Sequence, residues 1–178
     1  MIKKEFINSI ANGKVNVIQL ILDILNKTNT RYCLIGGLAV NAYVEPVVSL
    51  DIDIVAAVEN IDRIINHAEE RGFKVDYYEH SVNLTSQASD LRIRFQTDPR
   101  YQSFISKATI RNVLGYEMKV AAVEDILQGK IWAWMDLKRR RSKRQKDFAD
   151  MLRILESYRE LEEMLPQELK DQLREEDP

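Results

Sequence analysis

The spacing of apolar and polar residues divides the chain into three parts. Apolar residues recur at steps of three and four over 15–28, which predicts an amphipathic helix, and another helix is expected over 2–12. Between 31 and 121 the apolar runs are short and often alternate with polar residues, as they do in strands. Beyond Ala122 the spacing is helical to the end of the chain. The order therefore predicts helices first, strands next and helices last.

The middle part is predicted to form a sheet. Strands are expected at 31–35, 49–58, 73–86 and 91–96, with a hairpin over 108–122 that turns at Leu114-Gly115. Helices are expected at 38–44, 59–72, 123–140 and 143–164. Pro166 breaks the helical pattern after the last of these, and the acidic segment 167–178 is expected to be frayed. This pattern predicts an α+β fold, a mixed β-sheet flanked by helices with a C-terminal helical region.

Composition narrows the class of protein. The 178 residues favour one domain, and the net charge of −2 gives no reason to expect binding to nucleic acid or membrane by the surface as a whole. The single cysteine, Cys33, excludes an internal disulfide and fits a reducing compartment. No apolar run is long enough to span a bilayer, and the first residues are too polar for a signal peptide. We therefore expect a cytoplasmic protein.

Two aspartates, Asp51 and Asp53, lie within the apolar segment 49–58. Side chains alternate along a strand, so both carboxylates are expected on one face and Ile52 on the other. Two adjacent carboxylates repel each other, and burying them is costly unless a cation neutralises them. Mg²⁺ or Mn²⁺ would do so, because both ions prefer oxygen ligands. The alternative is an ordinary strand whose acidic residues face water.

A glycine pair, Gly36-Gly37, lies upstream of the two acids, between an expected strand and an expected helix. Backbone N–H groups at a helix start favour phosphate, and glycine lets a phosphate approach the backbone closely. A phosphate site followed by two metal-binding acids is what nucleotidyl transfer requires. Other phosphate motifs fit less well, because G-x-G-x-x-G is absent and Gly129 lacks the remaining residues of a P-loop.

The stretches LIGGLAVNAY and SLDIDIVAAV together resemble the core motif of the DNA polymerase β-type nucleotidyltransferase superfamily. Within it, the chain looks most like the small bacterial nucleotidyltransferases grouped with the AbiEii toxins of type IV toxin–antitoxin systems. The resemblance covers roughly residues 30–158. Taken together with the spacing of apolar residues, it predicts N-terminal helices over 1–30, a nucleotidyltransferase core over 31–121 and a C-terminal helical region over 122–178, packed on the core as a single compact unit.

The resemblance also implies an activity, which is the metal-dependent transfer of a nucleoside monophosphate from a nucleoside triphosphate to a hydroxyl group of a protein, an RNA or a small molecule. Asp51 and Asp53 would hold Mg²⁺ or Mn²⁺. Members of the superfamily usually carry a third acid on a later strand. Asp90 is expected to fill that role as a catalytic and metal-binding residue, with Asp98 as the alternative. A toxin role with an antitoxin partner is implied by analogy.

Other residues of the site follow from the same resemblance. The family pattern continues with a helix that carries a lysine and a second helix with the motif K-D-x-x-D. Nucleotide-binding residues are expected to be Gly36, Gly37, Ser49, Lys130 and Lys146. Asp147 and Asp150 are one helical turn apart, and we expect them to pair with basic residues or to orient Lys130.

A basic run over Lys138–Lys146 carries seven Lys or Arg residues in nine positions. It is either a solvated helix junction or a positive wall beside the active site. Two other functions stay open. If no third acid completes the metal site, the chain is a catalytically degraded nucleotidyltransferase-fold protein that binds or regulates. If the acids are only structural, it is an RNA-binding protein that uses the basic run.

Overall fold

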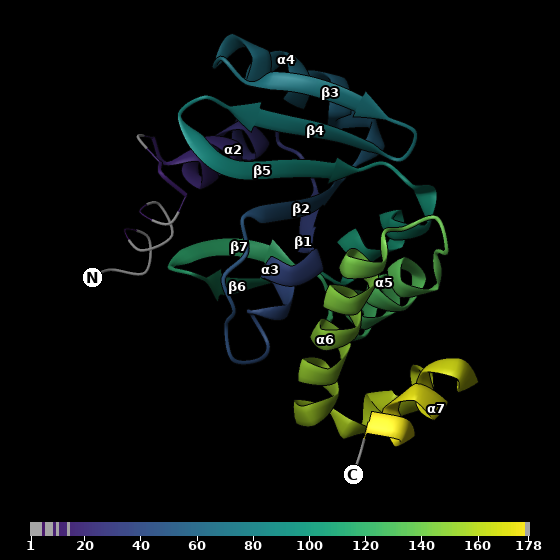
Figure 1. The fold of residues 1–178 in the computed structure, drawn as a ribbon. Helices are drawn as coiled ribbons and strands as arrows, with labels where there is room; N and C mark the ends of the chain where they lie inside the picture. Colours follow the sequence, from purple (N-terminus) through teal and green to yellow (C-terminus); the bar gives the residue numbers. More distant parts are fainter. Residues whose placement is uncertain (1–4, 6–8, 10, 14, 177–178) are drawn as a thin grey trace.

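Figure 1 shows the computed structural model, which describes residues 5, 9, 11–13 and 15–176. The strands are β1 (Tyr32–Ile35), β2 (Asp51–Ala56), β3 (Lys74–Tyr78), β4 (Ser81–Ser86), β5 (Ser89–Gln96), β6 (Thr109–Val113) and β7 (Tyr116–Val120). The α-helices are α2 (Val17–Lys27), α3 (Gly36–Val40), α4 (Ile61–Glu70), α5 (Val123–Met135), α6 (Arg141–Ser157) and α7 (Gln167–Glu176). Three 3₁₀ segments are η1 (Val58–Asn60), η2 (Pro99–Lys107) and η3 (Arg159–Met164).

All seven strands form one mixed sheet in the order β3-β4-β5-β2-β1-β7-β6, which places β2 at its centre. β2 pairs antiparallel with β1 and parallel with β5. In the parallel pair, Asp51 lies opposite Arg92 and Asp53 opposite Arg94. Because paired residues point to the same face, two acids and two arginines share one face of the central strands.

The helices form two groups around this sheet. α2 and α4 contact each other, and Figure 1 shows them behind the upper strands. α5 and α6 pack along each other, and the short helix α3 contacts both of them as well as β1 and β2. The C-terminal helices thus lie beside the end of β1 at which α3 begins. Among the described residues, no helix is long and apolar enough to cross a membrane.

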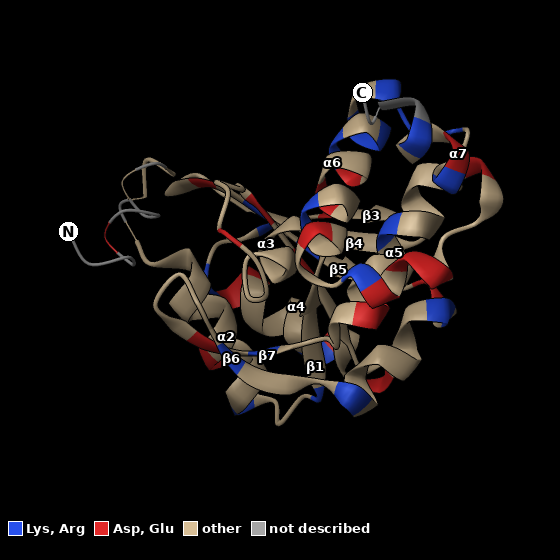
Figure 2. Cartoon of the chain, turned by 90° about the horizontal axis from the view of Figure 1, so that it is seen from below, with Lys and Arg blue, Asp and Glu red and all other residues tan. Residues whose placement is uncertain are grey.

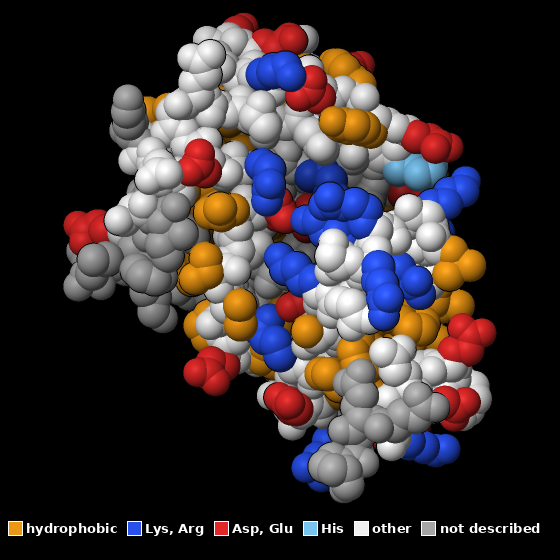
Figure 3. Space-filling view, in the orientation of Figure 1, with side chains coloured by type: hydrophobic (Ala, Val, Ile, Leu, Met, Phe, Trp, Pro, Cys, Tyr) orange, Lys and Arg blue, Asp and Glu red, His pale blue; other side chains and the backbone are white. Residues whose placement is uncertain are grey.

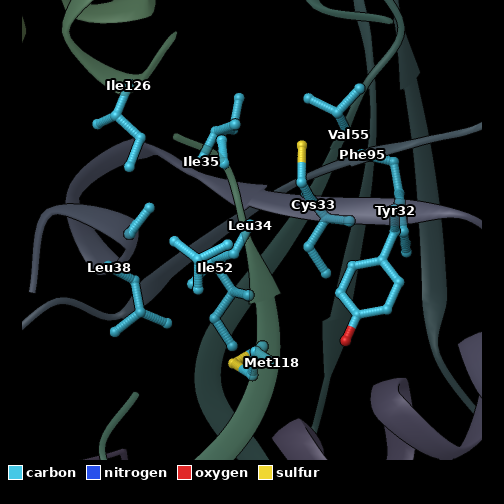
Figure 4. Packing of buried hydrophobic residues seen from close by; sticks show 14 of the residues in the cluster. Tyr32, Cys33, Leu34, Ile35, Leu38, Ile52, Val55, Phe95, Met118 and Ile126 are labelled. Atoms are coloured by element: carbon cyan, nitrogen blue, oxygen red, sulfur yellow. The ribbon is translucent and has the colours of Figure 1, made fainter. Parts of the chain in front are cut away.

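The core is built from the apolar residues of β1, β2 and the elements next to them. Figure 4 shows Leu34, Ile52 and Phe95 within this packing, and all three are at most 1% exposed. Cys33 is fully buried there, and burial raises the pKa of its thiol to about 12, which keeps it protonated at neutral pH. Cys33 therefore belongs to the core.

Most predicted elements are present, with shifted ends. The helix expected at 38–44 begins earlier, at Gly36, and ends at Val40. The helix expected at 123–140 ends at Met135, and the next one begins at Arg141, so part of the basic run forms the connection between them. The expected hairpin turn is confirmed, since Leu114 and Gly115 both have positive φ, 52° and 90°, as a type I′ turn requires. The helix expected over 2–12 lies for the most part outside the described residues.

The prediction of a frayed C-terminal tail is wrong. α7 spans Gln167–Glu176, and Leu169 within it is 1% exposed. Leu173, one turn later, is partly buried against the same core. Pro166 directly precedes this helix, and its carbonyl accepts hydrogen bonds from the N–H groups of Leu169 and Lys170. The prediction rested on the many acidic residues of the segment and overlooked its two leucines, which lie on one face of the helix and pack it against the molecule.

Candidate functional site

The acid pair of β2 is bonded to arginines of β5. Arg92 Nε lies 2.7 Å from Asp51 Oδ1, and Arg94 contacts Asp53 Oδ1 through Nε at 2.8 Å and through a terminal nitrogen at 2.7 Å. The Asp53 side chain is 9% exposed, whereas that of Asp51 is 27% exposed. The two carboxylates expected on one face are therefore there, and guanidinium groups neutralise both.

Asp51 also faces the basic run. Lys143 Nζ of α6 lies 3.5 Å from Asp51 Oδ2, so this carboxylate contacts cations from a strand and from a helix. Burial alone would raise the pKa of Asp51, but the positive charges of Arg92 and Lys143 outweigh it and lower the pKa. Asp51 is thus a carboxylate kept ionised by its neighbours.

Gly36 is required by the position of Asp53. A Cβ atom on Gly36 would lie 2.2 Å from Asp53 Oδ2, and the glycine has a φ of +72°. Any other residue would therefore collide with the carboxylate and strain the backbone. The space beside this glycine is used by Asp53 in the structure, and its use by a phosphate stays a prediction. At Gly37 the nearest atom to such a Cβ, Asp150 Oδ2, is 3.4 Å away.

A buried lysine joins α5 to α6 next to the acid pair. Lys130 Nζ lies 2.9 Å from Asp147 Oδ1 and 2.7 Å from Asp150 Oδ2, and its side chain is 8% exposed. Burial alone would lower the pKa of Lys130, but the two carboxylates raise it. The opposite oxygens are also paired, Asp147 with Arg139 at 2.8 Å and Asp150 with Arg153 at 2.9 Å. Both aspartates thus contact Lys130, and Asp147 also contacts the basic run.

A small cavity of about 130 Å³ opens at the acid pair and is strongly cationic. Six basic and three acidic side chains line it, an excess of three positive charges on a chain whose net charge is −2. The basic residues are Arg92, Arg94, Lys130, Arg139, Lys143 and Lys146, and the acidic ones are Asp51, Asp53 and Asp147. Figure 3 shows Lys and Arg side chains gathered across the middle of this face, with acidic atoms between them. Figure 2 shows that α6 carries charges of both signs.

A larger cavity of about 590 Å³ adjoins the small one. Asp53, Arg94, Lys130, Arg139 and Asp147 line both, so the two cavities meet at the acid pair. The larger cavity is also lined by an aromatic cluster, in which the Trp132 ring stacks on Phe104 and meets Tyr101 edge-on. The site therefore joins a small, charged compartment to a larger, partly apolar one.

The structure brings nearly all the predicted site residues together. Gly37, Ser49 and Lys146 line the small cavity, and Gly36 lines the large one. Ser49 is buried, and its hydroxyl accepts a hydrogen bond from the N–H of Asp51. With Asp51, Asp53, Lys130, Asp147 and the neighbouring Asp150, these residues form one contiguous region.

Asp90 is the exception. Its carboxylate accepts a hydrogen bond from Asn12 Nδ2 at 2.7 Å, and it lines neither cavity. Asp98 lines the large cavity but is paired with Arg100 at 2.7 Å. In the described part of the chain, no group of three or more His, Cys, Asp or Glu residues could hold a metal ion. The assignment of Asp90 as a metal ligand stays a prediction.

Arg92 and Arg94 were missing from the predicted site. The alternation in SDLRIRFQ places both on one face of a strand, but a sequence alone does not say which strand lies beside β2 or in what register. Arg139 was missed as a site residue for a similar reason, since the basic run does not show which of its members turn inward.

Comparisons with known proteins agree with this geometry. The profile of the family described as "Nucleotidyl transferase AbiEii toxin, Type IV TA system" matches residues 24–177. No curated protein matches the chain.

Several solved structures have a similar fold. The solution structure of the antibiotic-resistance factor ANT(2'')-Ia has a TM-score of 0.65 and 14% identity, covering 89% of this chain and 91% of that one. The lincomycin-bound lincosamide antibiotic adenylyltransferase LnuA has a TM-score of 0.56 and 14% identity, over 80% and 98%. A putative nucleotidyltransferase from Thermotoga maritima has a TM-score of 0.50 and 17% identity, over 65% and 81%. These likenesses confirm the α+β nucleotidyltransferase-type fold.

Proposed function

Because this chain belongs to the AbiEii family of nucleotidyltransferase toxins of type IV toxin–antitoxin systems, we propose that it transfers a nucleoside monophosphate from a nucleoside triphosphate to a hydroxyl group of a protein, an RNA or a small molecule. In this reaction the acceptor hydroxyl gives up its proton to solvent and its oxygen forms a bond to the α-phosphorus. The bond between the α-phosphorus and the oxygen that bridges to the β-phosphate breaks, and pyrophosphate leaves.

The observation that carries the proposal is the excess of positive charge around an acidic pair. A triphosphate is a polyanion, and the small cavity presents Lys and Arg side chains from β5, α5 and α6. Lys143 and Lys146, on α6, would bind phosphate oxygens. The acceptor would occupy the larger cavity, which meets the small one at Asp53.

Nucleotidyltransferases of this kind typically depend on a metal, and the donor set at the acid pair fits Mg²⁺ or Mn²⁺. Asp51 and Asp53 offer carboxylate oxygens side by side, and both contacts from Arg94 go to Oδ1 of Asp53, leaving Oδ2 on the side of Gly36. Mg²⁺ is commonly held by one or two carboxylates together with substrate phosphates, so these two residues suffice. When bound, the ion would supply charge neutralisation at the α-phosphate.

Lys130 would act by positioning. Its ammonium group is held by Asp147 and Asp150, and it fixes α5 against α6 at the border of both cavities. Arg139 is held over the same region by Asp147. The basic residues of α5, of α6 and of the connection between them would therefore meet the phosphates as a preorganised group, which reduces the entropy cost of binding.

Calorimetric titration with ATP, GTP, CTP and UTP in the presence of Mg²⁺ tests the proposal. We expect at least one nucleotide to bind the chain, and Asp53→Asn to weaken that binding in Mg²⁺. Incubation with α-³²P-labelled nucleotides and a cell extract should then label an acceptor with the unaltered chain and not with Asp53→Asn. If no nucleotide binds in Mg²⁺, the transferase proposal is wrong.

A second candidate function is nucleotide binding without transfer. It is favoured by one observation, which is that both acids are paired with arginines while Asp90 lines neither cavity. It predicts nucleotide binding with no label transferred to any acceptor. An RNA-binding role for the basic run is less favoured, because Arg139, Lys143 and Lys146 border the cavity at the acid pair.

The family also suggests a physiological role. We propose that the chain is the toxin of a toxin–antitoxin pair, with an antitoxin as its partner. Expression of the unaltered chain should then arrest the growth of a bacterial host, and expression of Asp53→Asn at the same level should not. Equal growth arrest by both chains would contradict a toxicity that depends on nucleotidyl transfer.

A further inference from the structure

Both acids of the site already carry a positive partner from the neighbouring strand. Arg94 donates from two nitrogens to Asp53 Oδ1, at 2.8 and 2.7 Å, and the Asp53 side chain is 9% exposed. Arg92 and Asp51 form the same kind of pair in a more open position, with 60% and 27% of their side chains exposed. The parallel register of β2 and β5 sets these partners opposite each other. The pairs are therefore built into the sheet.

We propose that Arg94 is a substrate-binding residue that exchanges partners: it pairs with Asp53 in the nucleotide-free chain and with the phosphates when a nucleotide binds, so that nucleotide and metal promote each other's binding. This inference rests on the proposed nucleotidyltransferase function and adds to it the way in which the site is regulated.

The first reason is competition for one carboxylate. A metal ion at Asp53 would lie beside a guanidinium that already neutralises this group, and like charges repel strongly where solvent is scarce. Metal binding to the nucleotide-free chain is therefore disfavoured. A triphosphate offers the guanidinium several oxygens and good bidentate geometry, which releases the carboxylate for the metal.

The second reason is position. Arg94 is one of the residues that line both the small and the large cavity, so its guanidinium borders the space in which phosphates would lie. Its side chain is 38% exposed, which leaves it free to change rotamer, whereas Asp53 is held against Gly36. Exchange thus needs a movement of the arginine alone.

Arg94→Gln tests the exchange, because it removes the charge and keeps a hydrogen-bond donor. Mn²⁺ binding to the nucleotide-free chain is measured by electron paramagnetic resonance, and binding of ATP, GTP, CTP and UTP is measured by calorimetry with EDTA and with Mn²⁺. We expect Arg94→Gln to bind Mn²⁺ alone roughly tenfold more tightly and to bind metal-free nucleotide roughly tenfold more weakly. Arg31→Gln is the matched control, since Arg31 pairs with Glu59 on the exposed surface, and it should change neither affinity.

Asp53→Asn tests the same exchange from the other side. It removes the partner of Arg94, so nucleotide in EDTA should bind several-fold more tightly than to the unaltered chain. If thermal unfolding shows that Arg94→Gln does not fold, the nucleotide affinity of Asp53→Asn in EDTA alone decides whether Arg94 exchanges partners. The inference is overturned if Arg94→Gln behaves like Arg31→Gln, if it loses nucleotide affinity without gaining Mn²⁺ affinity, or if Asp53→Asn gains no affinity in EDTA. Failure of the proposed function looks different, because the unaltered chain would then bind none of the four nucleotides even with Mn²⁺.

Discussion

The Asp53 carboxylate can occupy its position only because residue 36 has no side chain. Gly36→Ala places a Cβ where Asp53 Oδ2 now lies and keeps an unfavourable positive φ, so we expect it to lower the free energy of unfolding by about 2 kcal/mol. It should also weaken nucleotide binding, because the carboxylate must move. Urea unfolding and calorimetry measure the two effects.

Gly37→Ala is the matched control, since its nearest neighbour would be 3.4 Å away. We expect this variant to unfold within about 1 kcal/mol of the unaltered chain. Equal effects of the two substitutions would contradict the close approach of Asp53 to Gly36.

Lys130 is the most deeply buried basic residue of the site, with 8% of its side chain exposed. Lys130→Met would leave Asp147 and Asp150 buried with one cation fewer, and we expect it to lower the free energy of unfolding by about 3 kcal/mol. Lys74→Met serves as the control, because Lys74 is 73% exposed and its ion pair with Asp76 is worth about 1 kcal/mol or less. A loss at Lys130 no larger than that at Lys74 would contradict the buried pairing. Urea unfolding measures both.

The residue types of the site could be read from the sequence, but their partners could not. Alternation along a strand was enough to place Asp51 and Asp53 on one face. Their pairing with Arg92 and Arg94 depends on β2 and β5 being neighbours in parallel register, which no local pattern specifies. Asp90 was expected near the acids because it is an acidic residue on a later strand; its carboxylate accepts a hydrogen bond from Asn12 and lines neither cavity, so its role as a metal ligand stays a prediction.

Among the helices and strands, α7 is the element whose packing on the rest of the molecule is most easily tested. Leu169 is 1% exposed in α7, so Leu169→Ala should lower the free energy of unfolding by about 2 kcal/mol or more. Leu173→Ala, at a partly buried position of the same helix, should cost about half as much. If both variants lose less than about 0.5 kcal/mol, the two leucines behave like surface residues, and the prediction of a frayed C-terminal tail would be correct after all. Urea unfolding provides the measurement.

Helices and hairpins with strong local signals were predictable, and their ends were not. The turn at Leu114-Gly115 was found because Gly115 readily adopts the positive φ that such turns need. The end of α5 at Met135 was missed, because the basic residues that follow it are also good helix formers. Tertiary contacts, which the sequence does not display, decide such boundaries.

For the whole molecule, paired carboxylates predict acid sensitivity. The hydrogen bond from Arg100 lowers the pKa of Asp98, and Arg92 and Lys143 lower that of Asp51 against the effect of burial. A carboxyl group whose pKa is lower in the folded chain contributes stability above its unfolded pKa of about 3.9, and this is lost as the pH falls through the folded value. We therefore expect a constant free energy of unfolding between pH 5 and 7 and a decline below about pH 4.

Urea unfolding at pH 7, 5, 4 and 3 measures this decline. Asp98→Asn removes one of the contributing groups, so its stability should decline less steeply than that of the unaltered chain. Undiminished stability at pH 3 would contradict the contribution of these pairs.

The two carboxylate–guanidinium pairs between β2 and β5 also select how these strands meet while the chain folds. The partners are 41 residues apart in sequence, so the strands must find each other over a long intervening segment. A slip of one residue would turn both arginines into the apolar layer beside Ile93, and a slip of two would leave one acid and one arginine unpaired. The same two ion pairs therefore also disfavour wrong alignments of the strands at the centre of the sheet.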